Sequence, residues 1–389
     1  VLHYDGQAKT ITATGDVKVE QGTQVVSAPL LRLDNTTGDL HLSGGVHGEQ
    51  PPDRSFDTKE LTYNVNTGAI TVPGPIKGRA REGDFAADTV HGNMKMRVYD
   101  LLGHAIVRTS GKGAKTQDRT PTALSADHIH IDELNKRYVA QGNATVAQAD
   151  RTVSAPLLTF DDKIHVVKMT GGVHATEQPD RSADTAEVIY HTDTGQVSAP
   201  SQIAGRSSTD AFRADRAIGN TKTDIYDLEG NVVMRRQTAR DKDPTVLTAR
   251  DVRINGKAKT YTATGQPKIV QGTSTTTAQI ITLNDATNTA HMSGGVHAEQ
   301  PGGRTFDTPE LTYNTKSADF KMLGGIMAIF PLSKPTPTPT PFPSPNSSLS
   351  PQVPSPFANT AMPAQYATPS PTPPPTPTPS PTPSPSPTH

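Results

Sequence analysis

The chain of 389 residues contains no cysteine and no tryptophan. The absence of cysteine excludes disulfide bonds and thiolate metal sites. No stretch approaches the ~18 consecutive apolar residues of a membrane-spanning helix. The formal net charge is −1 and no stripe of basic residues is present that could bind the phosphates of a nucleic acid. Nucleic acid is therefore not expected as a partner. Only 33% of the residues are apolar, which favours a thin core between two sheets over a compact globule.

Composition changes sharply near Pro331. Residues 331–389 consist mainly of Pro, Thr and Ser, and no Asp, Glu, Lys or Arg follows Lys334. Such a segment cannot bury enough apolar surface to offset its ordering entropy, so a disordered, largely polyproline II tail is expected. A spacer is favoured over an SH3-type ligand, because the segment lacks the basic residues that orient such docking.

The rest of the chain is a tandem array. Gly-Gly-Val-His occurs three times, starting at Gly44, Gly171 and Gly294, and residues 56–64 return almost letter for letter at 306–314. Residues that recur in every copy serve the fold or a surface repeated along it, and a single catalytic centre would not come in threes. A non-enzymatic protein without a cofactor is therefore expected. The predicted division is a first repeat at 1–120, a second at 121–243, a shorter third at 244–330, and the tail at 331–389.

The first repeat is expected to be truncated at its N-terminus. Val1 aligns with His128, several residues inside the second copy. The natural protein is therefore expected to extend upstream, with an export signal or an anchor.

A smaller unit recurs inside each large repeat and predicts an all-β fold. Apolar and polar residues alternate from Leu31 to Leu42 on both sides of the turn at 35–38. This period of two is typical of two half-buried strands joined by a glycine-containing turn. The units are expected to begin strands at small or acidic heads: Ala28, Asp57, Asp88, Asp127, Ala155, Asp184, Asp215, Asp251, Ala278 and Asp307.

Fifteen apolar positions match between the copies and are expected to point inward in stacked rows, as in a solenoid or an elongated jelly roll. They are Leu31, Leu33, Leu42, Tyr63, Ile70, Leu158, Phe160, Met169, Tyr190, Val197, Ile281, Leu283, Met292, Tyr313 and Phe320.

The repeated pattern resembles the OstA-like domain of LptA and LptC, the lipopolysaccharide-transport proteins. Residues 12–19 with 27–31 look LptA-like, whereas 76–101 and their second copy at 203–228 look LptC-like. The resemblance covers roughly residues 1–330. The chain mixes features of both proteins, so neither role is assigned. It also departs from them in its tandem repeats and its proline-rich tail.

The resemblance implies an elongated, twisted β-jelly roll of two V-shaped antiparallel sheets in the periplasm, with an apolar groove for the acyl chains of lipopolysaccharide or a related glycolipid. The fifteen positions are then the candidate groove residues. Terminal strands would join other Lpt-type components by strand addition. Membrane association would come only through partners or an upstream segment. The alternative is a structural β-solenoid with a filled interior, acting as an envelope spacer or surface protein.

One proline tests the strand assignment. Pro267 stands where the first copy has Val17. Because proline cannot donate to a strand ladder, a strand edge or a bulge is expected there.

Three features that resemble chemical sites have simpler explanations. His47, His174 and His297 lack a second ligand with zinc-like spacing and are expected to be solvated histidines at strand ends. No metal site is predicted. The paired acids, which recur at unit heads, are expected to make turn hydrogen bonds rather than to catalyse; they are Asp57, Glu60, Asp184, Glu187, Asp307 and Glu310. The Gly-Gly pairs are expected to be bulges or bends rather than phosphate loops.

Four arginines could meet anionic headgroups at the rim of a groove. They are Arg79, Arg81, Arg206 and Arg235. Ordinary solvated charges are the favoured interpretation.

Overall fold

The computed structural model describes residues 1–80, 83–109, 122–237, 243–317 and 319–330, and these ranges contain β-strands and no helix. The all-β prediction is confirmed. The chain divides into two units, Val1–Leu332 and Ser333–His389, and all described strands belong to the first. The predicted disordered tail lies outside the described residues. None of the described residues forms a helix long and apolar enough to cross a membrane.

The strands of the first part of the chain follow one another with short turns. They are β1 (Leu2–Asp5), β2 (Thr10–Gln21), β3 (Gln24–Asp34), β4 (Asp39–Gln50), β5 (Arg54–Asn64), β6 (Ala69–Val72), β7 (Ile76–Ala80), β8 (Gly83–Ala87), β9 (Thr89–Asn93), β10 (Val98–Thr109), β11 (Thr122–Asp132), β12 (Arg137–Gln148), β13 (Arg151–Asp161) and β14 (Val166–Glu177).

The same pattern continues to the end of the described chain. These strands are β15 (Arg181–His191), β16 (Gln196–Ala199), β17 (Ile203–Arg206), β18 (Asp210–Ala214), β19 (Arg216–Asn220), β20 (Ile225–Arg236), β21 (Thr245–Asn255), β22 (Thr260–Thr264), β23 (Lys268–Gln271), β24 (Ser274–Thr277), β25 (Ile280–Asn284), β26 (Thr289–Gln300), β27 (Arg304–Asn314), β28 (Phe320–Leu323) and β29 (Met327–Ile329).

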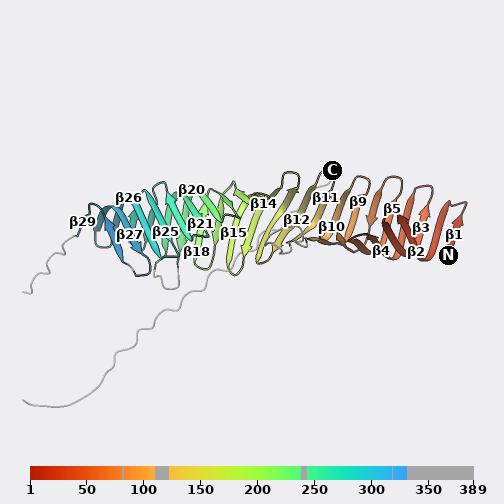
Figure 1. Cartoon of the computed structure of the whole chain (residues 1–389), viewed down its shortest axis with the longest axis horizontal. Coiled ribbons are helices and arrows are strands. Elements are labelled where there is room, and N and C mark those ends of the chain that lie inside the picture. Colours follow the sequence, from red (N-terminus) through yellow and green to blue (C-terminus); the bar gives the residue numbers. More distant parts are fainter. Residues whose placement is uncertain (81–82, 110–121, 238–242, 318, 331–389) are drawn as a thin grey trace, which may run out of the picture. The chain divides into compact units, whose positions relative to one another are not determined.

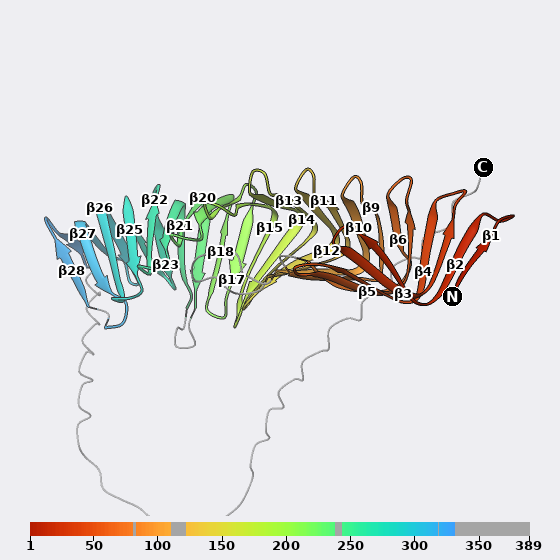
Figure 2. The same cartoon turned by 45° about the vertical axis from the view of Figure 1, so that its right-hand side comes forward.

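Successive long strands pair antiparallel, and in places two short strands take the position of one long strand, as β6 and β7 do beside β5. Together the strands form one continuous meander (Figure 1). The pairing crosses both predicted repeat boundaries, because β10 pairs with β11 and β20 pairs with β21. Figure 2 shows the same chain order of strands from a second direction. The sheet therefore has no break in the ladder at these boundaries, and the division into three repeats stays a prediction.

Each long strand bends at its middle. In β4 the register shifts between Ser43 and Val46, where Gly44 and Gly45 have φ values of +91° and +106°. A bulge of this kind bends the strand and re-aims its second half. The prediction that the Gly-Gly pairs are bends is confirmed.

Seven of the ten predicted unit heads need a correction, whereas Asp88, Asp215 and Ala278 do precede β9, β19 and β25. Ala28 and Asp57 were expected to begin strands, but they lie inside β3 and β5 beside the bend. The error arose because a bulge interrupts the alternation of side chains without ending the strand. At Pro267, where an edge or a bulge was expected, the strand is interrupted: β22 stops at Thr264 and β23 starts at Lys268. The missing donor of proline is consistent with this interruption.

The bend divides the strands into two arms. The first arm contains the halves next to the turn at 35–38 and its equivalents, and the second arm contains the halves next to the turn at 51–53. Residues that flank the bend on the inner side form the buried core, which we call the vertex. Leu42 and Val46 in β4 are each 2% exposed. The vertex continues from strand to strand through residues such as Leu101, Ile129, Leu158, Val173, Leu228, Val252, Ile281 and Val296.

Candidate functional site

Nine of the fifteen candidate positions lie on the first arm in one ladder of directly paired residues. Leu33 pairs with Leu40, Leu40 with Tyr63, and Tyr63 with Ile70. The ladder contains equivalent positions further along the chain: Phe160, Tyr190, Val197, Leu283, Tyr313 and Phe320. Eight of the nine are half-buried, and Phe320 is 61% exposed. We call this ladder the first-arm row.

The other six candidates lie in the vertex. They are Leu31, Leu42, Leu158, Met169, Ile281 and Met292, with exposed fractions of 9% or less. Their side chains are enclosed by neighbouring strands, so they form part of the filled core. Sequence matching between copies does not distinguish these six from the half-buried nine, because both sets alternate with polar residues in the same way.

A second apolar row lies on the second arm and was missing from the sequence prediction. It begins with Val26, Gly48, Phe56, Gly78 and Phe85, each paired with the next. It continues through Val107, Leu124, Val146 and Val153, and later through Phe212, Met234, Leu247 and Ile269. We call this the second-arm row.

Phenylalanine and glycine alternate in the second-arm row for a steric reason. A Cβ placed on Gly48 would lie 2.1 Å from the Phe56 ring, and one on Gly205 would lie 2.2 Å from Phe212. The rings therefore lie over the glycine backbone of the neighbouring strand. The repetition of Phe56 at Phe306 was a usable sequence signal, but it was assigned to the fold rather than to a site.

An ion pair joins the two arms beyond the vertex. Arg236, in the second-arm half of β20, makes bidentate hydrogen bonds of 2.9 and 3.0 Å to the carboxylate of Asp285, which follows the first-arm strand β25. Its Nε also donates to Asp210 at 2.7 Å, and the guanidinium lies 5.9 Å from the centre of the Tyr261 ring. We call this group the Arg236 bridge.

The electrostatics of the Arg236 bridge favour its charged form. The hydrogen bonds to Asp285 raise the pKa of Arg236 further above its usual range, although burial opposes the shift. Burial raises the pKa of the Tyr261 hydroxyl, so it stays protonated near neutral pH. An ionised arginine held by two carboxylates thus joins the arms at this level.

The repeated histidines lie on the outer face, beside the bend. His47 Nδ1 is 2.7 Å from Asp57 Oδ1 on β5, and its Nε2 is 2.9 Å from Glu49 Oε1. The equivalent pairs are His174 with Asp184 at 2.6 Å and His297 with Asp307 at 2.7 Å. Two predictions are therefore wrong in position: the histidines are within strands rather than at strand ends, and the aspartates bond across strands rather than in turns. The bend brings each pair together.

The companion glutamates have cross-strand partners of their own. Glu60 lies 3.9 Å from His41, Glu187 lies 3.0 Å from Lys168, and Glu310 lies 3.3 Å from His291.

The four candidate headgroup arginines do not form one cluster in the described residues. Arg79 bonds Asp84 at 3.2 Å, Arg206 bonds Ser182 at 3.2 Å, and Arg235 bonds Gln237 at 3.1 Å. Arg81 lies outside the described residues. The three described side chains are exposed, and each has a different hydrogen-bond partner.

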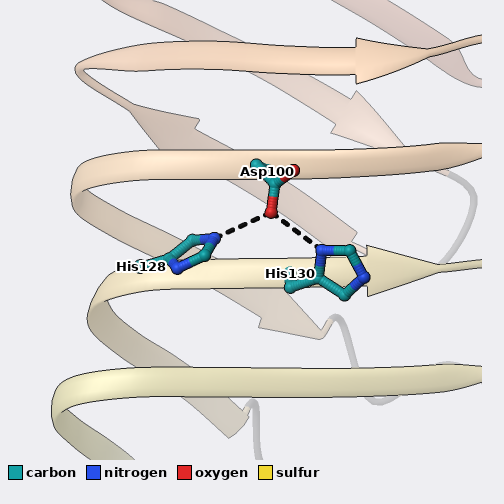
Figure 3. Close-up of side chains that lie close together, drawn as sticks. All are labelled: Asp100, His128 and His130. Atoms are coloured by element: carbon teal, nitrogen blue, oxygen red, sulfur yellow. Dashed lines mark hydrogen bonds and ion pairs between the residues drawn. The ribbon is translucent and has the colours of Figure 1, made fainter.

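One cluster on the outer face combines two imidazoles and a carboxylate (Figure 3). Asp100 Oδ1 on β10 lies 2.8 Å from His128 Nε2 and 2.8 Å from His130 Nδ1, both on β11. Burial raises the pKa of the Asp100 carboxyl, but the hydrogen bonds with His130 and His128 outweigh it, so the pKa lies below its ordinary value. The His-x-His spacing was the available signal, since residues i and i+2 share one face of a strand. The sequence analysis missed it because Asp100 is distant in sequence.

Two surface hollows lie away from the candidate rows. One, of about 540 Å³, is formed by the turn from Gln50 to Arg54, and the other, of about 590 Å³, lies between Val296, Thr308 and Met327. Neither is lined by any of the fifteen candidates.

Comparison with known proteins supports one family. Residues 210–300 match the family described as "Lipopolysaccharide-assembly, LptC-related", which confirms the predicted resemblance over that stretch. Among solved structures the chain is similar to LptH, "the LptA homologous periplasmic component of the conserved lipopolysaccharide transport device from Pseudomonas aeruginosa". The identity is 11%, the match covers 55% of this chain and 98% of that one, and the TM-score of 0.13 supports no inference about function. No curated protein matches the chain in sequence.

Proposed function

We propose that this chain is a periplasmic component of lipopolysaccharide transport that binds the acyl chains of lipopolysaccharide or a related glycolipid between its two arms. The role is one of binding rather than catalysis. The LptC-related match over residues 210–300 supports the transport class. The first-arm row and the second-arm row would supply the apolar contacts.

The observation that carries the proposal is the gradient of burial away from the vertex. Leu42 and Leu31 in the vertex are 2% and 9% exposed. Leu33, which lies two residues further from the bend than Leu31 on β3, is only half-buried. Rows of half-buried apolar side chains that run through many strands present a continuous surface. Burying acyl methylenes there would contribute about 0.8 kcal/mol each.

The Arg236 bridge supports a second candidate function. Because the Arg236 bridge joins the arms, the interior at that level is closed by an ion pair. This observation favours a structural β-solenoid in which the half-buried rows contact one another and no lipid enters.

Site-specific photocrosslinking to lipopolysaccharide distinguishes the two functions. Photoreactive residues would replace Leu33, Phe160 and Leu283 in the first-arm row, with outward-facing His41 and Lys168 as controls. The transport function predicts crosslinks at the row positions and few at the controls. Equal labelling at both sets, or none in a chain that circular dichroism shows to be folded, would favour the structural solenoid.

Partners of the same transport class would bind by strand addition. Within the described residues β29 pairs with β27 alone, and its Met327 and Ile329 side chains are more than half exposed. An edge strand that is paired on one side only and has exposed apolar side chains is a template for a partner's strand. The C-terminal edge of the described sheet is therefore the proposed docking edge.

A further inference from the structure

We propose that Asp100, His128 and His130 form a binding site for a divalent transition-metal ion of the zinc class, which would link β10 to β11. The three ligand atoms all lie within 4.8 Å of one another. Two imidazole nitrogens and one carboxylate oxygen are ligands that zinc accepts, and three protein ligands leave one position for water or another donor.

The two hydrogen bonds to Asp100 would lengthen on metal binding. Zinc bonds of about 2.0–2.1 Å in tetrahedral geometry separate two ligand atoms by about 3.3 Å. The present separations from Asp100 Oδ1 to each imidazole are 2.8 Å, so both distances would open by about half an ångström as hydrogen bonds are replaced by metal bonds. Side-chain exposures of 33%, 37% and 34% for His128, His130 and Asp100 leave the cluster accessible to an ion from solution.

A third imidazole lies within reach. His91 on β9 pairs directly with Asp100 in the strand register and, like Asp100, sits next to a buried inward residue, so both are on the outer face. Directly opposed side chains have Cβ atoms about 4.5–5.5 Å apart. On the other side, Val139 and Gln141 of β12 oppose His130 and His128 and bring no positive charge that would repel a cation.

The equivalent place in the next copy shows that the fold does not need these ligands. Asp227 corresponds to Asp100, and it pairs in register with Arg253 and with Ile218. Asp251 stands where the first of the two histidines does. The Arg253 guanidinium lies 3.8 Å from Asp227, an ion pair that leaves no place for a metal. The same strand pairing is thus built with a ligand set in one copy and with an ion pair in the other.

This difference supplies a matched control. In the full-length chain without a histidine tag, His128→Asp combined with His130→Arg reproduces the residues of the next copy and should keep the fold. Asp100→Asn removes the carboxylate ligand, and His47→Ala removes a histidine elsewhere on the outer face.

Zinc binding would be measured by isothermal titration after dialysis against a chelator, and X-ray absorption would identify the ligands. The expected result is one zinc ion per chain with at least two imidazoles in its coordination shell, with affinity unchanged in His47→Ala. Affinity for zinc should fall at least about tenfold in Asp100→Asn. Losing an outer-shell partner of a metal ligand typically costs 10- to 100-fold in affinity, and losing a direct ligand should cost at least as much. The double variant should not bind at this site.

Hydrogen exchange gives a readout independent of affinity. Zinc should slow amide exchange in β10 and β11 of the unmodified chain and leave exchange in the double variant unchanged, because a bound ion stabilises the state that holds it. Zinc binding that persists unaltered in the double variant would overturn the proposal. So would an unmodified chain that binds no more zinc than the folded double variant.

Discussion

Two histidines on the outer face, His47 and His297, each lie between two carboxylates. Hydrogen bonds with Glu49 and then Asp57 raise the pKa of His47, and those with Asp307 and then Glu299 raise the pKa of His297. Because each pKa is higher in the folded chain than the ordinary value of about 6.5, protonation favours the folded state. The stabilisation is fully present below about pH 6.5 and is lost as the pH rises through the raised pKa values.

Replacing both histidines with glutamine should therefore weaken the pH dependence of stability. Since both side chains are more than two-fifths exposed, the expected contribution of the pair is at most about 1 kcal/mol. Urea unfolding at about pH 5.5 and about pH 8.5 would give the free energy of unfolding of each chain. The unmodified chain should lose more stability than the variant on going to the higher pH. An equal loss in both chains would show that these histidines are not linked to folding.

The bend also makes a prediction at single residues. Gly44 and Gly45 have φ values of +91° and +106°, which side-chain-bearing residues rarely adopt. Gly44→Ala and Gly45→Ala should each lower the free energy of unfolding by about 1–3 kcal/mol. Gly44→Ala should cost more, because its Cβ would approach the Pro29 ring at 3.2 Å whereas that of Gly45 meets no atom within 4 Å.

Gly74 is the control for this comparison. Its φ lies outside the left-handed region and its Cβ would meet open space, so Gly74→Ala should be close to neutral or slightly stabilising. Equal urea midpoints for all three variants would mean that the bend does not depend on glycine.

At the scale of a strand, the position of an apolar side chain relative to the bend separates folding from binding. Leu42→Ala removes a vertex side chain that is 2% exposed, and it should lower the free energy of unfolding by about 2–5 kcal/mol. Leu33→Ala, in the half-buried first-arm row, should cost less and should reduce the binding of a fluorescent acyl probe. Denaturant unfolding and probe titration on the same two variants test both halves. A Leu42→Ala chain that loses probe binding while it keeps its stability would contradict this separation.

The Arg236 bridge makes a prediction about how the arms meet. Arg236→Leu removes the bidentate contact with Asp285 and should let the arms separate at that level. If lipid enters between the arms, photocrosslinking at Leu283 should increase in this variant, because Leu283 pairs directly with Tyr261 of the bridge. Asp84→Asn, which removes an exposed ion pair with Arg79, is the control and should leave crosslinking unchanged. Unaltered crosslinking in Arg236→Leu would indicate that side chains fill the interior, and that the Arg236 bridge is not what keeps lipid out.

At the scale of the whole described unit, stability should vary along the ladder of strands. β12, β13 and β14 are paired on both sides along nearly their full length. Within the described residues β1 pairs with β2 alone and β29 with β27 alone. In a quasi-linear array each element is stabilised mainly by its neighbours, so the ends should open most often.

Hydrogen exchange followed by mass spectrometry tests this gradient. Amides in β12–β14 should be the slowest to exchange, and those in β1 and β29 the fastest. Uniform protection from end to end would instead indicate that the strands unfold as a single cooperative block.

The sequence by itself determined the elements. Alternation with period two, glycine-containing turns and repeated copies identify strands, turns and bends, because each depends on residues that are neighbours in the chain. The loss of a strand donor at Pro267 follows from its missing N–H in the same local way. Local alternation also predicts which side chains share one face of a strand, and fourteen of the fifteen candidates are buried or half-buried, whereas Phe320 is exposed.

Only the tertiary structure decided which inward residues fill the vertex and which line the arms, because that depends on distance from a bend through which the strand continues. Strand register likewise brings Asp100 to His128 and His130, and the approach of the two arms brings Arg236 to Asp285 across 49 residues of sequence. Periodicity within one strand carries no record of its partner's register or of how the arms approach each other.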